Sequence, residues 1–426
     1  MPGTILITGA TSSLATRIIS LLLTSYSYQV PDSERENKHE YTLLITARNP
    51  SKIKVKLPEL ICNTNISIKV RALDLSSISS VHTFATEVSA DVQSSKIPPL
   101  TSIICNASHW DLRKEEEVTD DGYERTFQVN FLAHTVLILR LLGSFKPEAG
   151  GRIVLLTCDA HLHWPLRSVL ERGRARGLEK YPPGIPDDLD ELITVESQAP
   201  SEPQSPEQIL EELQEKPKIR KKEKPECMAR GILRHVHSKV AIIMWMYALN
   251  RRLEEDIALN TITAIAINPG TLLDSRQLRV NTPLRLKLLS LFLMTAVRPS
   301  LSLLCRLPFV GRKVKAKRTM RTCAEASGGV VGFALNVKDD AGTSGGTSSS
   351  TDKDTGVETN VGSDRGGGGN GDSDGDGGYY TLSLPVKNVG LPDMGCSDEE
   401  RQEALWRKTL QWAGIWNGNT AIQVDI

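Results

Sequence analysis

The stretch with the clearest chemical pattern is Thr4–Ile19, which passes from a short apolar run through a turn of small residues into an apolar-periodic segment. The β-branched run Thr4–Ile7 predicts a buried strand, and the periodic residues from Leu14 onward predict a helix. Free backbone N–H groups and the positive helix end would meet at one point, where they can bind an anion such as a phosphate. Gly9 can take the backbone angles of so sharp a turn. Because the glycine fingerprint is incomplete, two interpretations stay open, a nucleotide-binding turn and an ordinary strand–helix turn that binds nothing.

Arg48 is a second residue that could contact a phosphate, because it directly follows the apolar stretch Tyr41–Ala47. That stretch predicts a strand, and in a dinucleotide-binding fold the end of the second strand lies beside the adenosine ribose. An acidic residue there favours NAD, whereas a basic residue can hold the 2′-phosphate of NADP. The sequence therefore favours NADP, and the alternative is an arginine that only faces solvent.

The rest of the chain alternates segments that predict strands with segments that predict helices. Further strands are expected over Ile66–Leu73, Leu100–Cys105, Gly151–Leu156 and Thr261–Ile267, and long helices from a cap at Ser76 to Val92, over Asp120–Leu142 and over Ile232–Leu253. This alternation predicts a doubly wound parallel α/β sheet with right-handed crossovers. Ligands of such sheets bind at the carboxyl ends of the strands, where the polar and turn residues of this chain cluster.

Two stretches interrupt the alternation. Residues 165–231 are rich in proline and mixed charge and longer than a strand–helix loop requires, so we expect an insertion that is partly helical and mostly solvated. The Gly/Ser/Asp-rich stretch 339–378 cannot form a core. Order is expected to return with a strand over Tyr379–Val386 and an amphipathic helix opened by a capping box at 397–400. The expected boundaries are one domain over residues 1–337, a disordered loop over 338–378, and the closing strand and helix of the same domain over 379–426.

The composition narrows the classes of partner and compartment. The 426 residues carry no formal net charge at pH 7, so no global field favours a nucleic-acid partner. Seven cysteines without metal-ligand spacing indicate free thiols in a reducing compartment. The first predicted strand begins almost at Met1, which leaves no room for a signal peptide. We therefore expect a cytoplasmic protein without a metal.

The segment 279–321 contains no Asp or Glu, and its part Leu286–Val297 is strongly apolar. That apolar part is too short for a membrane span, which needs ~20 apolar residues. Two interpretations stay open. Residues 284–321 could lie on an anionic membrane as a basic amphipathic segment, or, as we favour, form a substrate lid on the sheet edge. The cations of the segment include Arg279, Arg285, Lys287, Arg298, Arg306, Arg312, Lys313, Lys315, Lys317 and Arg318.

In their order along the chain these features resemble the short-chain dehydrogenase/reductase family, and especially its fungal members with an extended substrate loop. The resemblance implies a Rossmann fold that binds a nicotinamide dinucleotide. Thr8 and Gly9 match the family's Thr-Gly-x-x-x-Gly-x-Gly loop, whose other two glycines are replaced here by Ser13 and Ala15. The positions that the resemblance places against the cofactor are Gly9, Ser12, Ser13, Leu14, Arg48, Asp74, Leu75, Asn106, Ala107, Lys239, Pro269 and Gly270.

The family's catalytic positions are only partly kept. Its chemistry needs a tyrosine four residues before a lysine and a serine after the fifth strand. Lys239 matches the lysine, but His235 stands at the tyrosine position and Cys158 at the serine position. A slip of one residue would make Thr157 the hydroxyl donor, and Asn130 matches the helix asparagine that holds an active-site water. An imidazole titrates near pH 6.5 and could still exchange a proton, whereas a thiol is a weaker hydrogen-bond donor than a hydroxyl.

The resemblance implies an NADP-dependent oxidoreductase that acts on a carbonyl or alcohol of a hydrophobic, secondary-metabolite-like substrate, with His235 as the proton donor. The alternatives are a catalytically impaired pseudoenzyme or nucleotide-binding scaffold, and a dehydratase or cyclase on the same fold. A covalent role for Cys158, activated by His161 or His235, is a further alternative. A zinc site made of two His-x-His pairs is disfavoured, because helix residues two apart face different sides. Family members commonly pair through their long helices, so a homodimer is also an expectation.

Overall fold

The computed structural model describes residues 3–28, 41–54, 66–113, 116–158, 185–195, 206–278, 280–297, 320–335, 378–382, 387–388 and 396–424. Within these ranges the strands are β1 (Thr4–Ile7), β2 (Tyr41–Ala47), β3 (Ile66–Ala72), β4 (Leu100–Cys105), β5 (Gly151–Leu156), β6 (Ile262–Asn268), β7 (Thr271–Leu272), β8 (Met320–Arg321), β9 (Tyr379–Thr381) and β10 (Lys387–Asn388). The main sheet has the order β10-β9-β6-β5-β4-β1-β2-β3, in which only the pair of β10 and β9 is antiparallel. This arrangement confirms the predicted doubly wound Rossmann fold.

The strand order reverses between β1 and β4, and these two strands pair with each other in parallel. Ile7, the last residue of β1, lies opposite Ile45 of β2 and Ile104 of β4. All three strands therefore end side by side, and the segments that follow them share one edge of the sheet. That edge at the reversal point is where doubly wound sheets bind their ligands.

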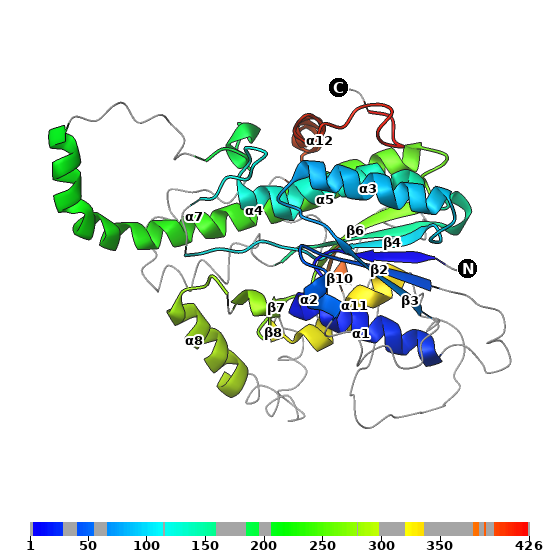
Figure 1. The fold of residues 1–426 in the computed structure, drawn as a ribbon, viewed down its shortest axis with the longest axis horizontal. Coiled ribbons are helices and arrows are strands. Elements are labelled where there is room, and N and C mark those ends of the chain that lie inside the picture. The colour runs from blue at the N-terminus through cyan, green and yellow to red at the C-terminus, as the bar shows by residue number, and fades with distance from the viewer. Residues whose placement is uncertain are drawn as a thin grey trace.

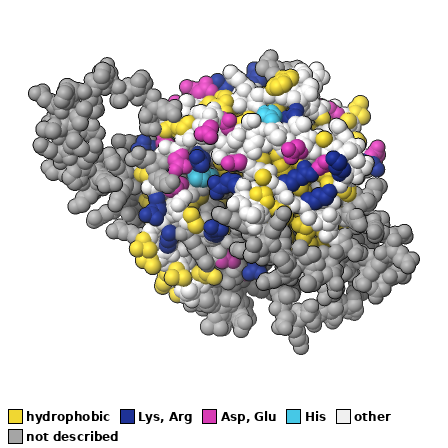
Figure 2. Space-filling model, in the orientation of Figure 1, with side chains coloured by type: hydrophobic (Ala, Val, Ile, Leu, Met, Phe, Trp, Pro, Cys, Tyr) yellow, Lys and Arg dark blue, Asp and Glu magenta, His cyan; other side chains and the backbone are white. Residues whose placement is uncertain are grey.

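Helices cover both faces of the sheet (Figure 1). Helix α1 (Ser13–Tyr28) packs against α11 (Cys323–Leu335) on one face, and the other face carries α3 (Ile78–Gln93), α5 (Ala133–Leu141), α7 (Pro206–Glu255) and α12 (Glu399–Ala413). The shorter helical elements are α2 (Ser51–Lys54), α4 (Arg125–Phe127), η2 (Gln128–Leu132), η3 (Leu142–Ser144), η4 (Pro147–Ala149), η7 (Leu189–Leu192), η9 (Arg276–Leu278), α8 (Leu284–Phe292) and η10 (Leu293–Val297). Helix α8 stands apart from the sheet, and hydrophobic side chains gather at the surface around it (Figure 2).

The helix expected over Asp120–Leu142 begins later than predicted. Glu124 caps it by accepting a hydrogen bond from the backbone of Phe127, and Tyr123 lies before this cap. The Tyr123 hydroxyl donates to the carbonyl of Trp412 in α12 at 3.1 Å. The helix then passes through the π-turn η2 into α5. Among the described helices, only Arg125–Ser144 is long and apolar enough to cross a membrane, and 83% of it is buried inside the fold.

The expected insertion differs in two ways from the prediction. Helix α7 starts at Pro206 and not near Ile232, so the end of the insertion is continuous with the long helix (Figure 1). The described part 185–195 is not solvated throughout, because Ile185 and Leu192 are buried in the core. Its acidic residue Asp190 accepts hydrogen bonds from Lys408 and Trp412, which attach it to α12. Residues 165–184 and 196–205 lie outside the described residues.

Several element boundaries shift by one or more residues. Ser77 and not Ser76 caps α3, because the backbone and hydroxyl of Ser76 both donate to Asp74. The final helix is capped by Asp398, one residue after the predicted cap. The last parallel strand is shorter than predicted and ends at Thr381; residues 383–386 and nearly all of the loop expected to be disordered lie outside the described residues.

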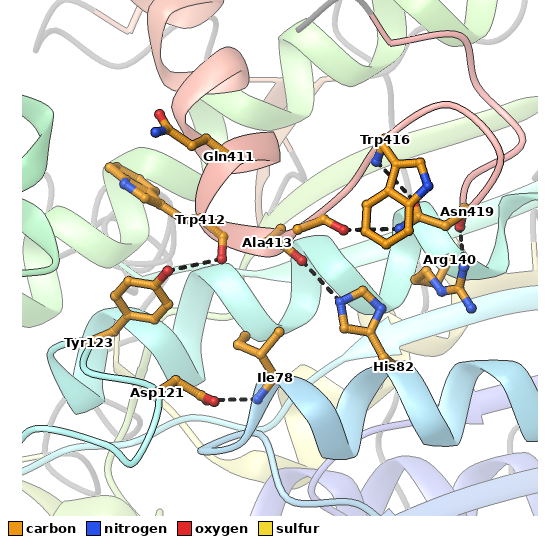
Figure 3. A pocket seen from close by; sticks show the side chains of 11 residues that line it. Ile78, His82, Asp121, Tyr123, Arg140, Gln411, Trp412, Ala413, Trp416 and Asn419 are labelled. Carbon is orange, nitrogen blue, oxygen red and sulfur yellow. Dashed lines mark hydrogen bonds between the residues drawn. The ribbon is translucent and has the colours of Figure 1, made fainter.

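Helix α12 lies over α5 and α7 and, with the start of α3, lines an open pocket of about 630 Å³ (Figure 3). His82 in this pocket contacts the carbonyl of Ala413, and Arg140 donates to the carbonyl of Asn419. None of the residues predicted to bind cofactor or substrate lines the pocket. It is therefore a separate feature from the candidate site.

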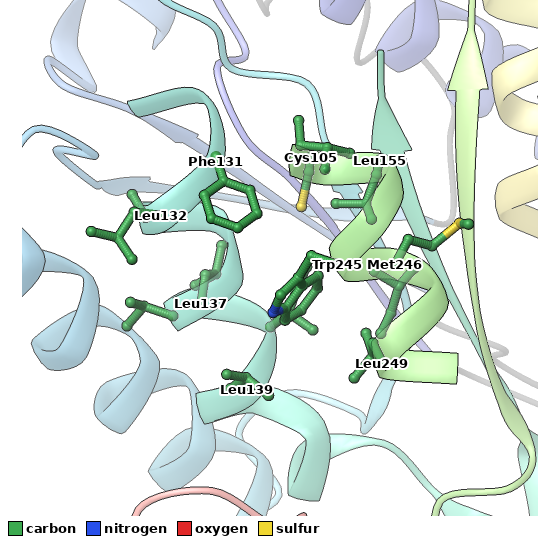
Figure 4. Close-up of a cluster of buried hydrophobic side chains, with 14 of the residues drawn as sticks. Cys105, Phe131, Leu132, Leu137, Leu139, Leu155, Trp245, Met246 and Leu249 are labelled. Carbon is green, nitrogen blue, oxygen red and sulfur yellow. The ribbon is translucent and has the colours of Figure 1, made fainter. Parts of the chain in front are cut away.

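Alternation along the strands divides the core into two layers. Leu6 points into the cluster under α3, α5 and α7, whereas Ile5 and Ile7 point into the cluster under α1 and α11. Figure 4 shows the first cluster, in which Trp245 of α7 lies among side chains of α5 and the central strands. Trp245 also stacks on Trp406 with ring centroids 5.5 Å apart, so α12 extends the same core. These two layers pack α1 and α7 against opposite faces of the sheet.

Candidate functional site

The turn after β1 brings two strand ends so close that it requires a glycine. Gly9 has a φ of 68°, and a Cβ atom on it would lie 2.8 Å from the Cα atom of Ala107. Asn106, beside Ala107, donates its side-chain amide to the carbonyls of Thr8 at 2.8 Å and Gly9 at 3.1 Å. The turns after β1 and β4 are thus fixed to each other.

The first turn of α1 leaves backbone donors for a ligand. The N–H groups of Ala15 and Thr16 donate to the hydroxyl and the carbonyl of Ser12. By helix geometry the N–H groups of Ser13 and Leu14 have no partner within the helix. These two donors, with the positive helix end, form the predicted anion-binding corner.

The two replaced glycines are accommodated in different ways. The Ser13 hydroxyl accepts a hydrogen bond from the backbone of Arg276, which holds η9 across the start of α1. Ala15 is fully buried and packs in the core beneath the turn. The substitutions therefore alter the packing around the corner and leave the corner itself in place.

The other residues predicted to contact the cofactor all follow strand ends on this edge of the sheet. Arg48 follows β2 and is exposed, Asp74 and Leu75 follow β3, Asn106 and Ala107 follow β4, and Pro269 and Gly270 follow β6. Asp74 uses one carboxylate oxygen to hold Ser76, and Gly270 turns with a φ of 81° while its N–H donates to Asn268. The structure thus brings the whole predicted set to one edge.

The predicted catalytic residues meet where β5 ends. His235 and Lys239 lie four residues apart on α7 and face the end of β5, where Cys158 follows the strand. The Nε2 atom of His235 is 3.4 Å from the Sγ atom of Cys158. The ammonium group of Lys239 donates to the carbonyl of Leu156 at 2.8 Å. Only 4% of His235 and 5% of Lys239 is exposed, so both groups act in a desolvated setting.

Asn130 of the π-turn η2 orients the imidazole. Its Oδ1 atom accepts a hydrogen bond from the backbone of His109 at 2.6 Å, which fixes the orientation of the amide. Its Nδ2 atom donates to the hydroxyl of Ser238 at 3.1 Å and lies 3.5 Å from Nδ1 of His235. An amide N–H beside Nδ1 favours the tautomer with its proton on Nε2. His235 therefore presents an N–H group to Cys158.

Electrostatics keeps this imidazole neutral. Burial lowers the pKa of His235 well below its ordinary value, and the positive charge of Lys239 lowers it further. Burial also lowers the pKa of Lys239, while the nearby thiol of Cys158 acts in the opposite direction. At neutral pH His235 is consequently a hydrogen-bond donor through Nε2–H and not a source of an acidic proton.

Two further residues of the site were not singled out from the sequence. His134 accepts the hydroxyl proton of Thr8 at Nε2 (3.0 Å) and donates from Nδ1 to the carbonyl of Asn130 (3.1 Å), because the Thr8 oxygen already accepts two backbone N–H groups. Burial lowers the pKa of His134 to about 4. Trp110 packs edge-on against His235 with ring centroids 4.7 Å apart. The spacing of His134 four residues after Asn130 was the only signal in the sequence for either residue.

The structure describes only one of the two His-x-His pairs that were considered as zinc ligands. His161 and His163 lie outside the described residues. In the part of the chain that the structure describes, no group of three or more His, Cys, Asp or Glu side chains could hold a metal ion. His237 is on the same helix as His235, and only His235 is placed beside Cys158.

The site fits the dinucleotide that the fold implies. The hydroxyl of Thr157 is buried, with 3% of the residue exposed, and has no hydrogen-bond partner within the described residues. A buried hydroxyl without a partner is costly, so it marks a place where a ligand group would complete the site.

In sequence the chain is similar to fungal short-chain dehydrogenases. No family model matches the chain. The chain is 26% identical over 287 residues to the short-chain dehydrogenase iccH of Talaromyces variabilis, an alignment that covers 63% of this chain and 70% of the relative. It is 36% identical over 132 residues to the short chain dehydrogenase resG of Aspergillus sclerotiorum, covering 28% of this chain and only 34% of that relative. A solved structure of an uncharacterised Mycobacterium paratuberculosis protein aligns with a TM-score of 0.48 and 17% identity, covering 97% of this chain and 96% of the other.

Proposed function

Because the chain belongs to the short-chain dehydrogenase/reductase family of oxidoreductases, we propose that it uses NADP to interconvert a carbonyl and an alcohol group on a small hydrophobic substrate. The observation that supports this most directly is the cluster of Cys158, His235 and Lys239 at the end of β5. It lies on the same sheet edge as the turn at Gly9. A cofactor held at that turn and a substrate at the cluster would share one crevice.

Different residues of the chain would bind different parts of the dinucleotide. The N–H groups of Ser13 and Leu14 would hold the pyrophosphate, and Arg48 would hold the 2′-phosphate of NADP. Lys239 and the hydroxyl of Thr157 lie at the opposite, reacting end. When bound, the nicotinamide supplies or accepts the hydride.

The proton step differs from that of a tyrosine-based site. In carbonyl reduction, negative charge develops on the substrate oxygen, and Nε2–H of His235 can stabilise it as a fixed donor. The Cys158 thiol can give its proton to that oxygen, leaving a thiolate beside His235 and the Lys239 cation, and solvent then returns a proton to sulfur. Cys158 is thus assigned the acid role that the sequence suggested for His235, because the lowered pKa of His235 makes it a poor acid.

A second candidate, a nucleotide-binding scaffold without turnover, is favoured by one specific observation. Neither His235 nor Cys158 reproduces a phenol held beside a lysine, and loss of general acid catalysis typically costs about 10²–10⁴ in rate. Titrating NADPH with the protein and recording its fluorescence separates the candidates. Binding with turnover of a generic aldehyde or ketone supports the oxidoreductase, binding without turnover supports the scaffold, and no binding contradicts both.

The proposal also includes a fungal secondary metabolite as substrate, a cytoplasmic location and a homodimer. The two fungal relatives support a fungal origin of the protein, and the substrate class follows only from the family resemblance. The homodimer was expected through the long helices, but α12 occupies part of their surface, since Phe127 packs edge-on against Trp412 and Trp245 stacks on Trp406. A dimer contact would therefore use α12 or the uncovered parts of these helices.

A further inference from the structure

Helix α8 presents an apolar face to solvent. Leu284 is 70% exposed, and Leu288, Leu291 and Phe292 are each 56% exposed. These positions recur at helical spacing and share one side of the helix. Of the eight large hydrophobic side chains that are exposed in the described part of the chain, five belong to α8, with Leu289 as the fifth. Figure 2 shows hydrophobic side chains, with Lys and Arg side chains beside them, at the edge of the molecule where Figure 1 places α8.

The opposite side of the same helix is already packed. Leu286 is partly buried and packs against the main core cluster, so α8 is held to the domain on that side. The exposed side of α8 is therefore distinct from the side that packs against the core. Single exposed hydrophobic residues are ordinary, whereas a contiguous patch marks an interaction surface.

The charge of the surrounding chain selects the partner. The described residues just before and within α8, 276–278 and 280–297, carry Arg276, Arg285 and Lys287 and no Asp or Glu. A second copy of this chain would bring like charges together across the patch. Lipid with anionic headgroups matches both properties, because acyl chains accept the leucines and headgroups attract the cations. We propose that α8 docks the protein on an anionic membrane surface, with Leu284, Leu288, Leu291 and Phe292 inserted at the level of the headgroups.

The base of α8 is connected to the candidate site. Thr282, two residues before the helix, accepts a hydrogen bond from the indole of Trp110 at 3.1 Å, and Trp110 packs against His235. The carbonyl of Asn281 accepts from the backbone of Leu112. Docking through α8 would thus set the site beside the lipid. This inference about the substrate rests on the proposed function. It names the substrate class as a lipophilic alcohol or carbonyl compound dissolved in the membrane.

The test is co-sedimentation of the full chain with vesicles. Vesicles of phosphatidylcholine alone are compared with vesicles of phosphatidylcholine and phosphatidylserine. We expect the wild-type chain to pellet with the anionic vesicles, to pellet much less with the neutral ones, and to be released by salt. The double variant Leu288→Asp, Leu291→Asp should lose at least about tenfold in vesicle affinity, because charged groups replace the inserting residues.

The matched control is Ile257→Asp, which alters a hydrophobic side chain that is 91% exposed and lies outside α8, just after α7. This variant should bind vesicles as the wild type does. Thermal unfolding of all variants checks that each is folded. Wild-type protein that stays in the supernatant with anionic vesicles, or a double variant that pellets like wild type, overturns the proposal.

Two other measurements keep the outcomes distinct. Sedimentation without lipid reveals self-association, and a wild-type dimer that the double variant loses would make a second copy the occupant of the patch and overturn the lipid proposal. NADPH titration of the same proteins reads out the proposed function separately. Vesicle binding without NADPH binding would contradict the function and leave the docking intact, and the reverse result would contradict the docking alone.

Discussion

The Sγ atom of Cys158 lies 3.4 Å from the Nε2 atom of His235. Cys158 follows the end of β5, and His235 belongs to α7, 77 residues later in the sequence. The amide nitrogen of Asn130, which can only donate, lies 3.5 Å from the other ring nitrogen, and this favours the tautomer whose proton points at sulfur. The resemblance predicts that this pair stands where a hydroxyl and a phenol stand in the short-chain dehydrogenase/reductase family. It supplies a donor and a thiol proton but no low-pKa phenol.

Restoring the family's groups should increase reduction. In the double variant His235→Tyr, Cys158→Ser, we expect NADPH-dependent reduction of a generic carbonyl substrate to rise by about 10²-fold, because general acid catalysis typically contributes about 10²–10⁴. Steady-state absorbance of NADPH measures the rate.

The lysine provides the control for this increase. Adding Lys239→Met to the double variant should remove the gain, because the charge of Lys239 is what would lower the pKa of the new phenol. An unchanged rate in the double variant, with NADPH still bound, would show that the shape of the pocket and not the missing groups limits the reaction.

The sequence was sufficient to predict the sheet and the edge that carries the site. Each strand is a short apolar run whose next residues are polar, as at Cys105 and Asn106, and parallel pairing then brings those residues together whatever the details of packing. That His235 and Cys158 stand at the family's tyrosine and serine positions stays a prediction from motif spacing. The proximity of these two side chains was inferred from the family's fold, and in the structure Nε2 of His235 lies 3.4 Å from Sγ of Cys158.

What the sequence did not reveal depends on distant contacts. The helix at Asn130 was predicted as a regular α-helix, but the π-turn changes which carbonyls are free and lets His134 bond to the carbonyl of Asn130. The acidic Asp190 was predicted as solvated because its partners, Lys408 and Trp412, lie more than two hundred residues later. Local pattern carries no information about either contact.

Arg48 should decide between the two dinucleotides. Arg48→Asp places a carboxylate where a 2′-phosphate would lie, so we expect affinity for NADPH to fall by about 10–100-fold, as expected for the loss of a charged contact. Affinity for NADH should fall less or rise, because a carboxylate can hold the ribose hydroxyl. Fluorescence titration of both nucleotides measures the ratio. Arg48→Lys is the matched control and should retain the preference for NADPH, and an unchanged ratio in Arg48→Asp would show that Arg48 only faces solvent.

Gly9→Ala should disrupt the cofactor turn by a steric clash. The added methyl group would lie 2.8 Å from the Cα atom of Ala107 at a φ of 68°, so both strain and overlap oppose it. We expect a loss of about 1–3 kcal/mol in the free energy of unfolding and a loss of NADPH binding. Gly122→Ala is the matched control, since Gly122 has a φ of 86° with no atom within 4 Å of an added Cβ. It reports strain without overlap, and equal effects in both variants would refute the role of the close approach.

His134 should make the stability of the protein depend on pH. Its pKa is about 4 in the folded protein and near 6.5 when unfolded, because burial disfavours the charged ring. The unfolded chain therefore binds a proton first, so stability is complete above pH 6.5 and falls as the pH drops toward 4, by about 3 kcal/mol from this residue. His235 acts in the same direction, since burial lowers its pKa too. Chemical denaturation at several pH values measures the slope.

A variant of His134 separates this slope from other acid effects and tests its link to the cofactor turn. His134→Gln cannot gain a proton, so the loss of stability between pH 6.5 and 4 should be smaller by about 2–3 kcal/mol than in the wild type. At pH 7 the variant should be less stable by about 1–2 kcal/mol, because the hydroxyl of Thr8 and the carbonyl of Asn130 lose their well-placed partner. Since Thr8 also accepts the backbone N–H groups of Asn106 and Ala107, its release should raise the dissociation constant of NADPH as well. A variant with the wild-type pH slope would show that His134 is already protonated or solvated in the native protein, contrary to its buried position between β1 and the π-turn.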